Sequence, residues 1–215
     1  MLARPLMRRA LLPLFALTLF ASSALLFLLE PMFAKMILPL LGGAPAVWSA
    51  ALLFFQAALL AGYAYAHATT TWLGTRRQAV LHVGIVLLPL LVLPIGIPAG
   101  WVPPATGSPV LWLLALLTLA IGLPFFVVST TAPLLQRWFS RTTHTSAQDP
   151  YFLYRASNLG SMLALLVYPL ALEPTFRLGE QARGWSIGYG VLATMTIACA
   201  VLLRHSPRPA TSRTS

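Results

Sequence analysis

Long apolar runs dominate this sequence and decide what it can fold into. The hydrocarbon core of a bilayer is about 30 Å thick, and a helix needs roughly 20 mainly apolar residues to cross it. Only 8% of the 215 residues are charged and the mean hydropathy is +0.81, whereas a soluble domain is about 25% charged. Because these few charged side chains cannot cover the surface of a water-soluble domain, we predict that the chain is surrounded by lipid. Six runs are long enough to be spans, at about 10–40, 45–67, 78–98, 109–133, 151–172 and 185–204.

The predicted fold is therefore all-α, a polytopic transmembrane helical bundle. Residues 1–204 form one six-helix domain, and 205–215 form a disordered, basic cytoplasmic tail because Pro, Ser and Arg dominate there. A cleaved signal peptide is an alternative for the first run. A signal peptide has an apolar segment of about 7–15 residues, but this run continues to Leu29 and beyond, which favours a retained span.

The basic residues predict the orientation of the chain. Ten of the fourteen occur before the first run, in every second connection and after the sixth run: Arg4, Arg8, Arg9, Arg76, Arg77, Arg137, Arg141, Arg204, Arg208 and Arg213. The last outer connection carries Arg177 and Arg183, which are balanced by Glu173 and Glu180. The connections 42–45 and 99–108 carry no charge. Lys and Arg accumulate on the cytoplasmic side of membrane proteins, so both termini are predicted to be cytoplasmic and the chain to be a multi-pass protein of the cell inner (plasma) membrane. The net charge of +10 does not predict a nucleic-acid partner, because no basic face with base-reading groups is present.

Four charged residues near the predicted outer side form a candidate intramembrane polar network: Glu30, Lys35, Glu173 and Arg177. The pattern Leu-Glu-Pro-x-Phe occurs at 29–33 and again at 172–176, and each copy is followed by a basic residue. The first and fifth spans run in the same direction, so both copies lie on the outer side. We expect the carboxylates of Glu30 and Glu173 to lie within about 15 Å of each other, because a larger separation is beyond a Debye length. The network is either a salt-bridged clamp between helices or a substrate or ion site.

A second set of polar residues is predicted to line a cavity. Gln56, Tyr63 and His67 are spaced by seven and four residues and so share a helix face, and a polar face in lipid should look toward the bundle or a cavity. Ser129, Thr130 and Thr131 follow Pro124, where a broken helix could line a cavity. The alternatives are a structural role for His67 and simple hydroxyl-to-backbone bonding for the three hydroxyls.

The sequence predicts no metal, no cofactor and no catalytic residues. The four histidines are scattered without the spacing of metal ligands, and no nucleophile, acid–base pair or glycine-rich fingerprint is evident. Small residues at 156, 160 and 164 form a ridge on the fifth span, and Gly184 and Gly188 form another on the sixth. Such ridges predict close helix packing in lipid.

Three stretches together resemble a known family. They are FLLEPMFAKMILPLLGGAPAVWSAALLFFQAALLAGYAYAH at 27–67, GLPFFVVSTTAPLLQRWFS at 122–140 and DPYFLYRASNLGSMLALLVYPLALEP at 149–174. They are similar to the amino-terminal membrane region of spermidine-synthase-like proteins, in which a major-facilitator-like half is fused to a spermidine synthase domain. The resemblance covers about residues 12–203 and implies a half-facilitator-like bundle. The synthase domain is not found after the sixth run, and a polyamine would need more carboxylates than Glu30 and Glu173.

We therefore expect a transporter-like membrane module that is not an enzyme. Facilitators pair two six-helix halves around a central site, so the expected partners are the lipid bilayer and either a second copy of the chain or a second membrane chain. The alternative is a non-catalytic anchor or regulatory subunit for a separately encoded synthase or methyltransferase, with a soluble synthase-like partner.

Overall fold

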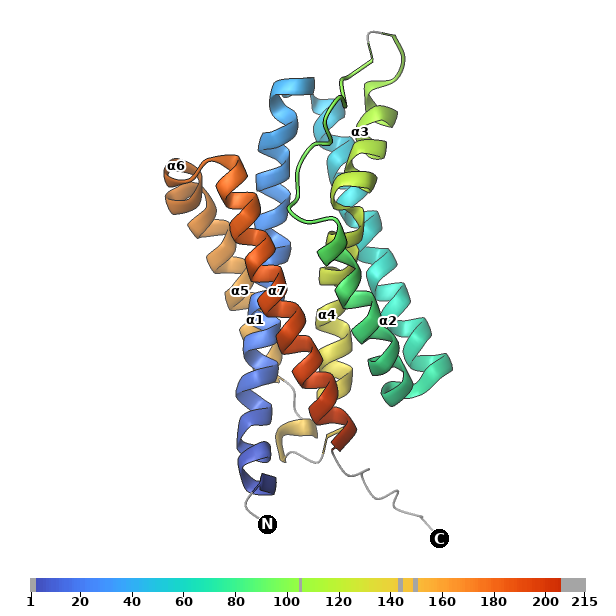
Figure 1. Cartoon of the computed structure of the whole chain (residues 1–215), viewed down its shortest axis with the longest axis vertical. Helices are drawn as coiled ribbons and strands as arrows, with labels where there is room; N and C mark the ends of the chain where they lie inside the picture. The colour runs from blue at the N-terminus through green and yellow to red at the C-terminus, as the bar shows by residue number, and fades with distance from the viewer. Residues whose placement is uncertain (1–2, 105, 143–144, 149–150, 206–215) are drawn as a thin grey trace.

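The structure of the chain is a computed structural model that describes residues 3–104, 106–142, 145–148 and 151–205, and within these residues all regular structure is helical (Figure 1). In chain order the elements are α1 (Ala3–Leu41), α2 (Pro45–Leu87), η1 (Leu88–Leu91), α3 (Pro109–Leu117), η2 (Thr118–Gly122), α4 (Leu123–Phe139), η3 (Thr145–Gln148), α5 (Tyr151–Val167), η4 (Tyr168–Leu172), α6 (Glu173–Thr175) and α7 (Leu178–His205). The predicted tail beyond residue 205 lies outside the described residues. The predicted all-α class is confirmed for the described part of the chain.

Five helical segments of the described residues are long and apolar enough to cross a membrane. They are Leu11–Leu41, Pro45–Leu91, Pro109–Phe139, Tyr151–Thr175 and Leu178–Arg204. Three prolines lie inside α1 without ending it, which a helix in lipid tolerates where neighbouring groups take up the freed carbonyls. The length and composition of these helices are compatible with a multi-pass integral membrane protein.

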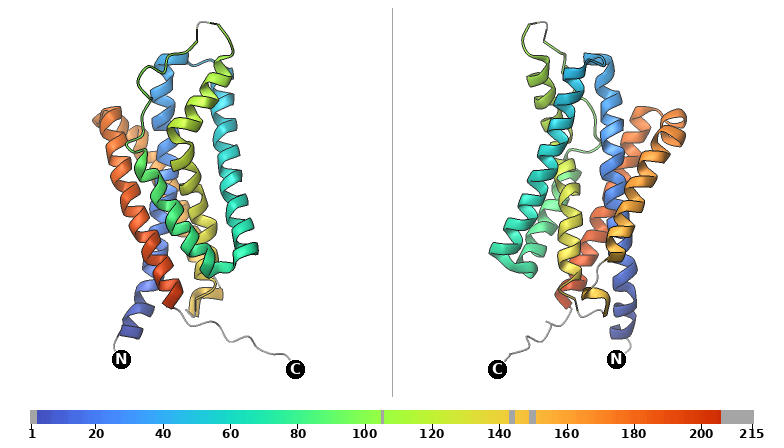
Figure 2. Two further views of the ribbon diagram at one scale, coloured as in Figure 1. Left: turned by 45° about the vertical axis from the view of Figure 1, so that its right-hand side comes forward. Right: turned by 180° about the vertical axis from the view of Figure 1, so that it is seen from behind.

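The second of these segments consists of two helical arms that meet at Gly74. Gly74 has φ +71° and ψ 160°, a conformation that is essentially restricted to glycine. The first arm descends to this turn and the second runs back beside it (Figures 1 and 2). We call the end of the bundle with the Gly74 turn the lower end, and the end with residues 42–44 the upper end.

Several predicted span boundaries differ from the structure. The run predicted to end at 67 stays helical up to the break at Gly74, and the run predicted to end at 133 continues to Phe139. The run predicted at 78–98 is helical only to Leu91, because Pro94 and Pro98 lack a backbone N–H and disfavour helix in the residue before them. The following residues remain inside the bundle, where Ile95 is 3% exposed. The last helix begins at Leu178, seven residues before the predicted boundary, because the Glu180 carboxylate accepts a 2.8 Å hydrogen bond from the Arg177 N–H and caps the helix.

α1 is the helix around which the bundle is built, and it packs against α4, α5 and α7. One cluster of buried apolar side chains fills the upper half, with Phe33 and Ile121 among its members. A second cluster fills the lower half around Phe15 and Trp138. α5 lies at the edge of the bundle against α1 (Figure 2), and its side chains that face away from α1 are exposed.

Two glycines allow helices to approach closely. A Cβ at Gly160 of α5 would lie 2.4 Å from the Phe20 carbonyl oxygen of α1, and a Cβ at Gly62 of α2 would lie 2.1 Å from Ser129 Oγ of α4. The predicted close packing of the ridge at 156–164 therefore exists at the α1–α5 contact. On α7, Gly188 approaches Leu25, whereas Gly184 faces open space.

Candidate functional site

The candidate site is an open groove near the upper end of the bundle, between α1, the start of α2 and the end of α5. Its volume is about 570 Å³, within the range of about 300–1,000 Å³ usual for small-molecule sites. We call it the upper groove, and it is lined by Phe27, Glu30, Pro31, Ala34, Lys35, Leu38, Trp48, Leu165, Tyr168, Pro169 and Glu173. Most of these side chains are apolar, so its few charged groups stand out.

Lys35 of α1 and Glu173 of α6 form an ion pair across the upper groove through Nζ and Oε1. Their side chains are 39% and 37% exposed. An ion pair this open to solvent contributes only about 0–1 kcal/mol to stability. For the site, the ion pair means that Glu173 already neutralises the positive charge of Lys35.

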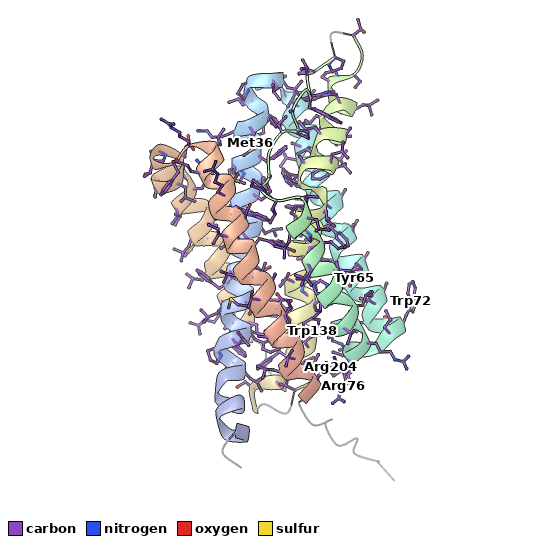
Figure 3. All side chains as sticks on the ribbon, viewed as in Figure 1. Met36, Tyr65, Trp72, Arg76, Trp138 and Arg204 are labelled. Atoms are coloured by element: carbon purple, nitrogen blue, oxygen red, sulfur yellow. The ribbon has the colours of Figure 1, made fainter. Side chains whose placement is uncertain are left out.

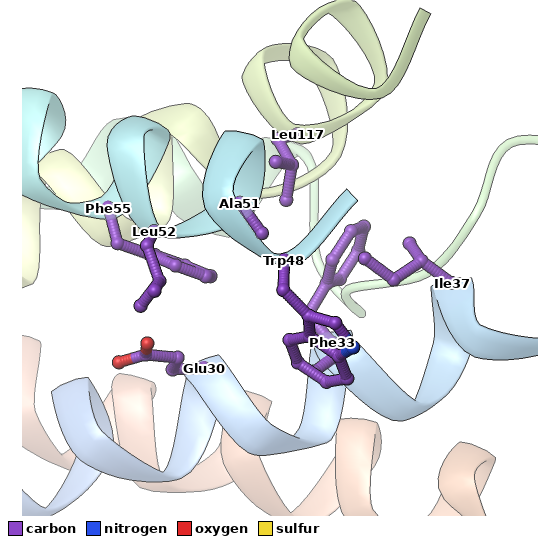
Figure 4. A pocket seen from close by; sticks show the side chains of 9 residues that line it. Glu30, Phe33, Ile37, Trp48, Ala51, Leu52, Phe55 and Leu117 are labelled. Atoms are coloured by element: carbon purple, nitrogen blue, oxygen red, sulfur yellow. The ribbon is translucent and has the colours of Figure 1, made fainter. Parts of the chain in front are cut away.

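Glu30 also lines the upper groove, one and a half helical turns before Lys35. Its side chain is half-buried, and no hydrogen bond or ion pair joins its carboxylate to any described residue. Beside it lies a small cavity of about 20 Å³ whose wall includes Leu52 and Phe55 of α2, and the carboxylate faces these apolar side chains (Figure 4). A charge without a partner in such surroundings is costly and is retained mainly where it has a function.

Tyr168 is the third polar group of the upper groove. It is 4% exposed, and its hydroxyl has no hydrogen-bond partner among the described residues. Tyr168 begins η4, a π-helical segment in which Pro169 cannot donate a backbone hydrogen bond. Such π segments frequently occur at functional sites. The same side chain also lines a second cavity of about 310 Å³ between α1, η4 and α7, so it separates two hollows.

The structure brings together part of the predicted polar network. Glu30, Lys35 and Glu173 lie on one groove, whereas the side chain of Arg177 is exposed and does not line it. Arg177 instead contributes its backbone N–H to the cap by Glu180. That these residues act together as a functional site stays a prediction.

The six residues predicted to line a cavity occupy different surroundings, and none lines the upper groove. Gln56, Tyr63 and His67 are exposed on the outer face of the first α2 arm, with Tyr63 48% exposed. Ser129, Thr130 and Thr131 are buried and donate to carbonyl oxygens of their own helix, those of Phe126 and Val127. This second arrangement is the hydroxyl-to-backbone alternative.

A buried polar cluster in the lower half was missed by the sequence reasoning. Gln78 is 0% exposed, its Nε2 donates to acceptors on the first arm of α2, and its Oε1 accepts a 3.2 Å hydrogen bond from Trp138 Nε1 of α4. His82 lies beside it, with Nδ1 3.4 Å from the Tyr65 hydroxyl. The sequence did not indicate that Gln78 is buried, because it directly follows Arg76 and Arg77 in a connection that was expected to face water.

Within the described residues no three His, Cys, Asp or Glu side chains come together as a metal site. The single cysteine, Cys199, is buried and lies 3.6 Å from the Thr18 hydroxyl. The side chains of the upper groove can recognise a ligand by charge, hydrogen bonding and apolar contact.

The fold and the surface define a class, that of helical proteins compatible with multi-pass insertion in a membrane. No family model, no curated protein and no solved structure matches the chain.

Proposed function

We propose that the chain is a transporter-like membrane module whose solute path runs through the upper groove. The observation that carries this proposal is Glu30, a half-buried carboxylate without a partner in an apolar groove that also contains a π segment. Charged groups inside membrane segments mark ion or substrate paths by default, and interrupted helices line the binding sites of many transporters. The proposed role is non-catalytic, and a relation to the membrane half of spermidine-synthase-like proteins is part of the proposal.

The proposed topology has six spans, with the two arms of α2 counted separately. The supporting observation is the break at Gly74, where the helical path reverses direction. Residues 75–91 of the second arm extend about 25 Å at 1.5 Å per residue, and the following chain at 92–98 stays against the core. The second arm thus reaches most of the way across a bilayer.

The proposed location is the cell inner (plasma) membrane, with both termini and the lower end in the cytoplasm. Arg76, Arg77 and Arg204 together line a basic groove of about 450 Å³. Arg76 and Arg204 lie at the lower end of the bundle (Figure 3). Arg137 lies in the last turn of α4 at the same end. This concentration of arginine on one end is the pattern expected of a cytoplasmic face.

The proposed partner is a second copy of the chain or a second membrane chain that covers the outer face of α2 and α5. Gln56, Tyr63 and His67 are exposed there, and α5 exposes a row of large apolar side chains that includes Leu159, Leu163 and Leu166. Polar groups that face lipid are costly. A second half packed on this face would remove that cost and close the upper groove.

Proteoliposomes test this function. The purified chain is reconstituted and supplied with a defined mixture of amines, amino acids, carboxylates and sugars, and internal solutes are measured by mass spectrometry. We expect saturable uptake of at least one solute by the wild type and loss of most of that uptake in Glu30→Gln. Glu180→Gln changes the net charge equally outside the upper groove and should transport normally.

Two outcomes would count against transport. Uptake of no solute in the mixture, together with co-purification of a soluble synthase or methyltransferase, would favour the anchor or regulatory subunit. Equal uptake by wild type and Glu30→Gln would remove the upper groove from the path.

A further inference from the structure

We infer that the upper groove binds an organic monocation, an apolar molecule that carries one ammonium group, and that Glu30 is its counter-charge. This inference rests on the proposed function and names the ligand class of the same site. Its basis is the arrangement of charges in the upper groove, together with the apolar walls and an unpartnered hydroxyl.

The charges of the upper groove select for one positive charge. The groove contains two carboxylates and one ammonium, so its formal net charge is −1. Lys35 and Glu173 satisfy each other as an ion pair, which leaves Glu30 as the one charge of the groove without a partner. A ligand ammonium would neutralise this charge, whereas an anion would be repelled. A dication would leave its second charge unmatched unless the Lys35–Glu173 pair opened.

The hydrogen-bonding groups fit an ammonium as well. The Tyr168 side chain is nine-tenths buried and belongs to the wall of the upper groove, and its hydroxyl has no hydrogen-bond partner among the described residues. If the ring turns toward the groove, its oxygen can accept from an ammonium N–H while Glu30 accepts from another, because an ammonium has several donors and no acceptor. Binding would thus satisfy two groups that the protein leaves unsatisfied.

The walls of the upper groove are mostly apolar, so they favour a ligand whose uncharged part is also apolar. Phe27, Leu38 and Leu165 line it together with Trp48, whose ring lies near Glu30 and belongs to the small cavity as well. An indole is the side chain that best stabilises a cation over its face. The volume of about 570 Å³ accommodates a small organic molecule.

The test measures binding separately from transport. The full chain is placed in phosphatidylcholine nanodiscs, and saturable binding of radiolabelled 2-phenylethylammonium is measured against empty nanodiscs. We expect saturable binding that unlabelled 2-phenylethylammonium displaces, with phenylacetate inactive and hexane-1,6-diammonium a weaker competitor. Glu30→Gln should lower the affinity about tenfold or more, the scale of one charge-assisted hydrogen bond. Glu180→Gln should bind like the wild type.

The Lys35→Met variant distinguishes a ligand-binding role of the groove charges from a purely structural one, because only the first predicts a change in ligand preference. Removing the lysine frees Glu173 and changes the formal net charge of the upper groove from −1 to −2, so the preference should move toward hexane-1,6-diammonium by about tenfold. Each variant is checked for a monodisperse elution profile. If Glu30→Gln fails this check, Trp48→Leu replaces it, with an expected loss of about fivefold in affinity for the monocation.

The inference is overturned by absence of saturable binding in the wild type, by competition from phenylacetate equal to that from the monocation, or by unchanged affinity in Glu30→Gln. Its failure is distinguishable from failure of the proposed function. Binding that depends on Glu30 without uptake supports the ligand class and contradicts transport. Glu30-dependent uptake of a sugar or carboxylate, without monocation binding, supports transport and overturns the ligand class.

Discussion

Gln78 shows how this bundle buries a polar side chain without leaving its amide unsatisfied. Its Nε2 lies 3.0 Å from the Ala66 carbonyl oxygen, 2.8 Å from Thr69 Oγ1 and 2.7 Å from Thr70 Oγ1, and its Oε1 accepts from Trp138 Nε1. One residue thereby joins the second arm of α2 to the first arm and to α4. Glu30 is the opposite case, because its carboxylate is half-buried and has no such set of partners.

Replacing Gln78 by Met should lower the free energy of unfolding by about 1–3 kcal/mol, because the buried Trp138 N–H loses its acceptor. Unfolding in micelles, followed by circular dichroism, measures the change. Gln56→Met is the matched control, and as an exposed substitution it should stay within about 0.5 kcal/mol of the wild type. In a double-mutant cycle, Trp138→Phe should cost less in the Gln78→Met background. Equal losses for the two Gln variants would contradict the role given to this cluster.

At the scale of elements, the contact between α1 and α5 positions the upper groove. The two helices touch at Gly160, where Phe20 and Ser23 leave no room for a Cβ. Farther up, Lys35 and Glu173 join the same two stretches of chain. The close approach and the ion pair together place Tyr168 and Glu30 on the wall of the same groove.

Gly160→Ala should therefore destabilise the protein by about 1–3 kcal/mol, the usual cost of overpacking. Gly84→Ala is the matched control, because nothing lies within 4 Å of a Cβ there and alanine is the better helix former by up to about 1 kcal/mol. Thermal unfolding in the same detergent should move in opposite directions for the two variants. A shift of the same sign and size in both would mean that α1 and α5 do not approach as described.

At the scale of the whole molecule, the bundle is asymmetric in charge and in coverage. Arg76, Arg77, Arg137 and Arg204 lie at its lower end, while the uncharged residues 42–45, 99–104 and 106–108 lie at its upper end. α2 and α5 each expose side chains along their length, and both contribute residues to the upper groove. If the arginine-rich lower end faces the cytoplasm, as the distribution of basic residues in membrane proteins predicts, the upper groove faces the outside of the cell.

Cysteine labelling in intact cells tests this orientation. Thr106→Cys at the upper end should react with a membrane-impermeant maleimide, whereas Ser140→Cys at the lower end should react only after permeabilisation. Both positions are exposed, and the native Cys199 is 0% exposed, so its background labelling should be low. The reverse pattern would invert the proposed orientation. Labelling of both positions from outside would mean that the α3–α4 segment does not cross the membrane.

Several features of the site could be predicted from the sequence because they depend on local pattern. The duplicated Leu-Glu-Pro-x-Phe motif pointed to the two stretches that Lys35 and Glu173 join. The polar stripe Gln56, Tyr63 and His67 was expected to face the bundle or a cavity, yet it is exposed on this chain. Helical spacing shows which residues share a face, but the direction of that face depends on which neighbours the helix has.

The amino-acid sequence by itself determined the class of the fold, since apolar length and scarce charge favour helices suited to lipid wherever they occur. It also determined the difference in charge between the two ends of the bundle, because that difference follows from the positions of the arginines along the chain. Only the tertiary structure decided that Glu173 pairs with Lys35 and leaves Glu30 alone. The physical reason is distance along the chain: Lys35 and Glu173 are 138 residues apart, so their contact depends on how α1 and α5 pack and not on any local preference.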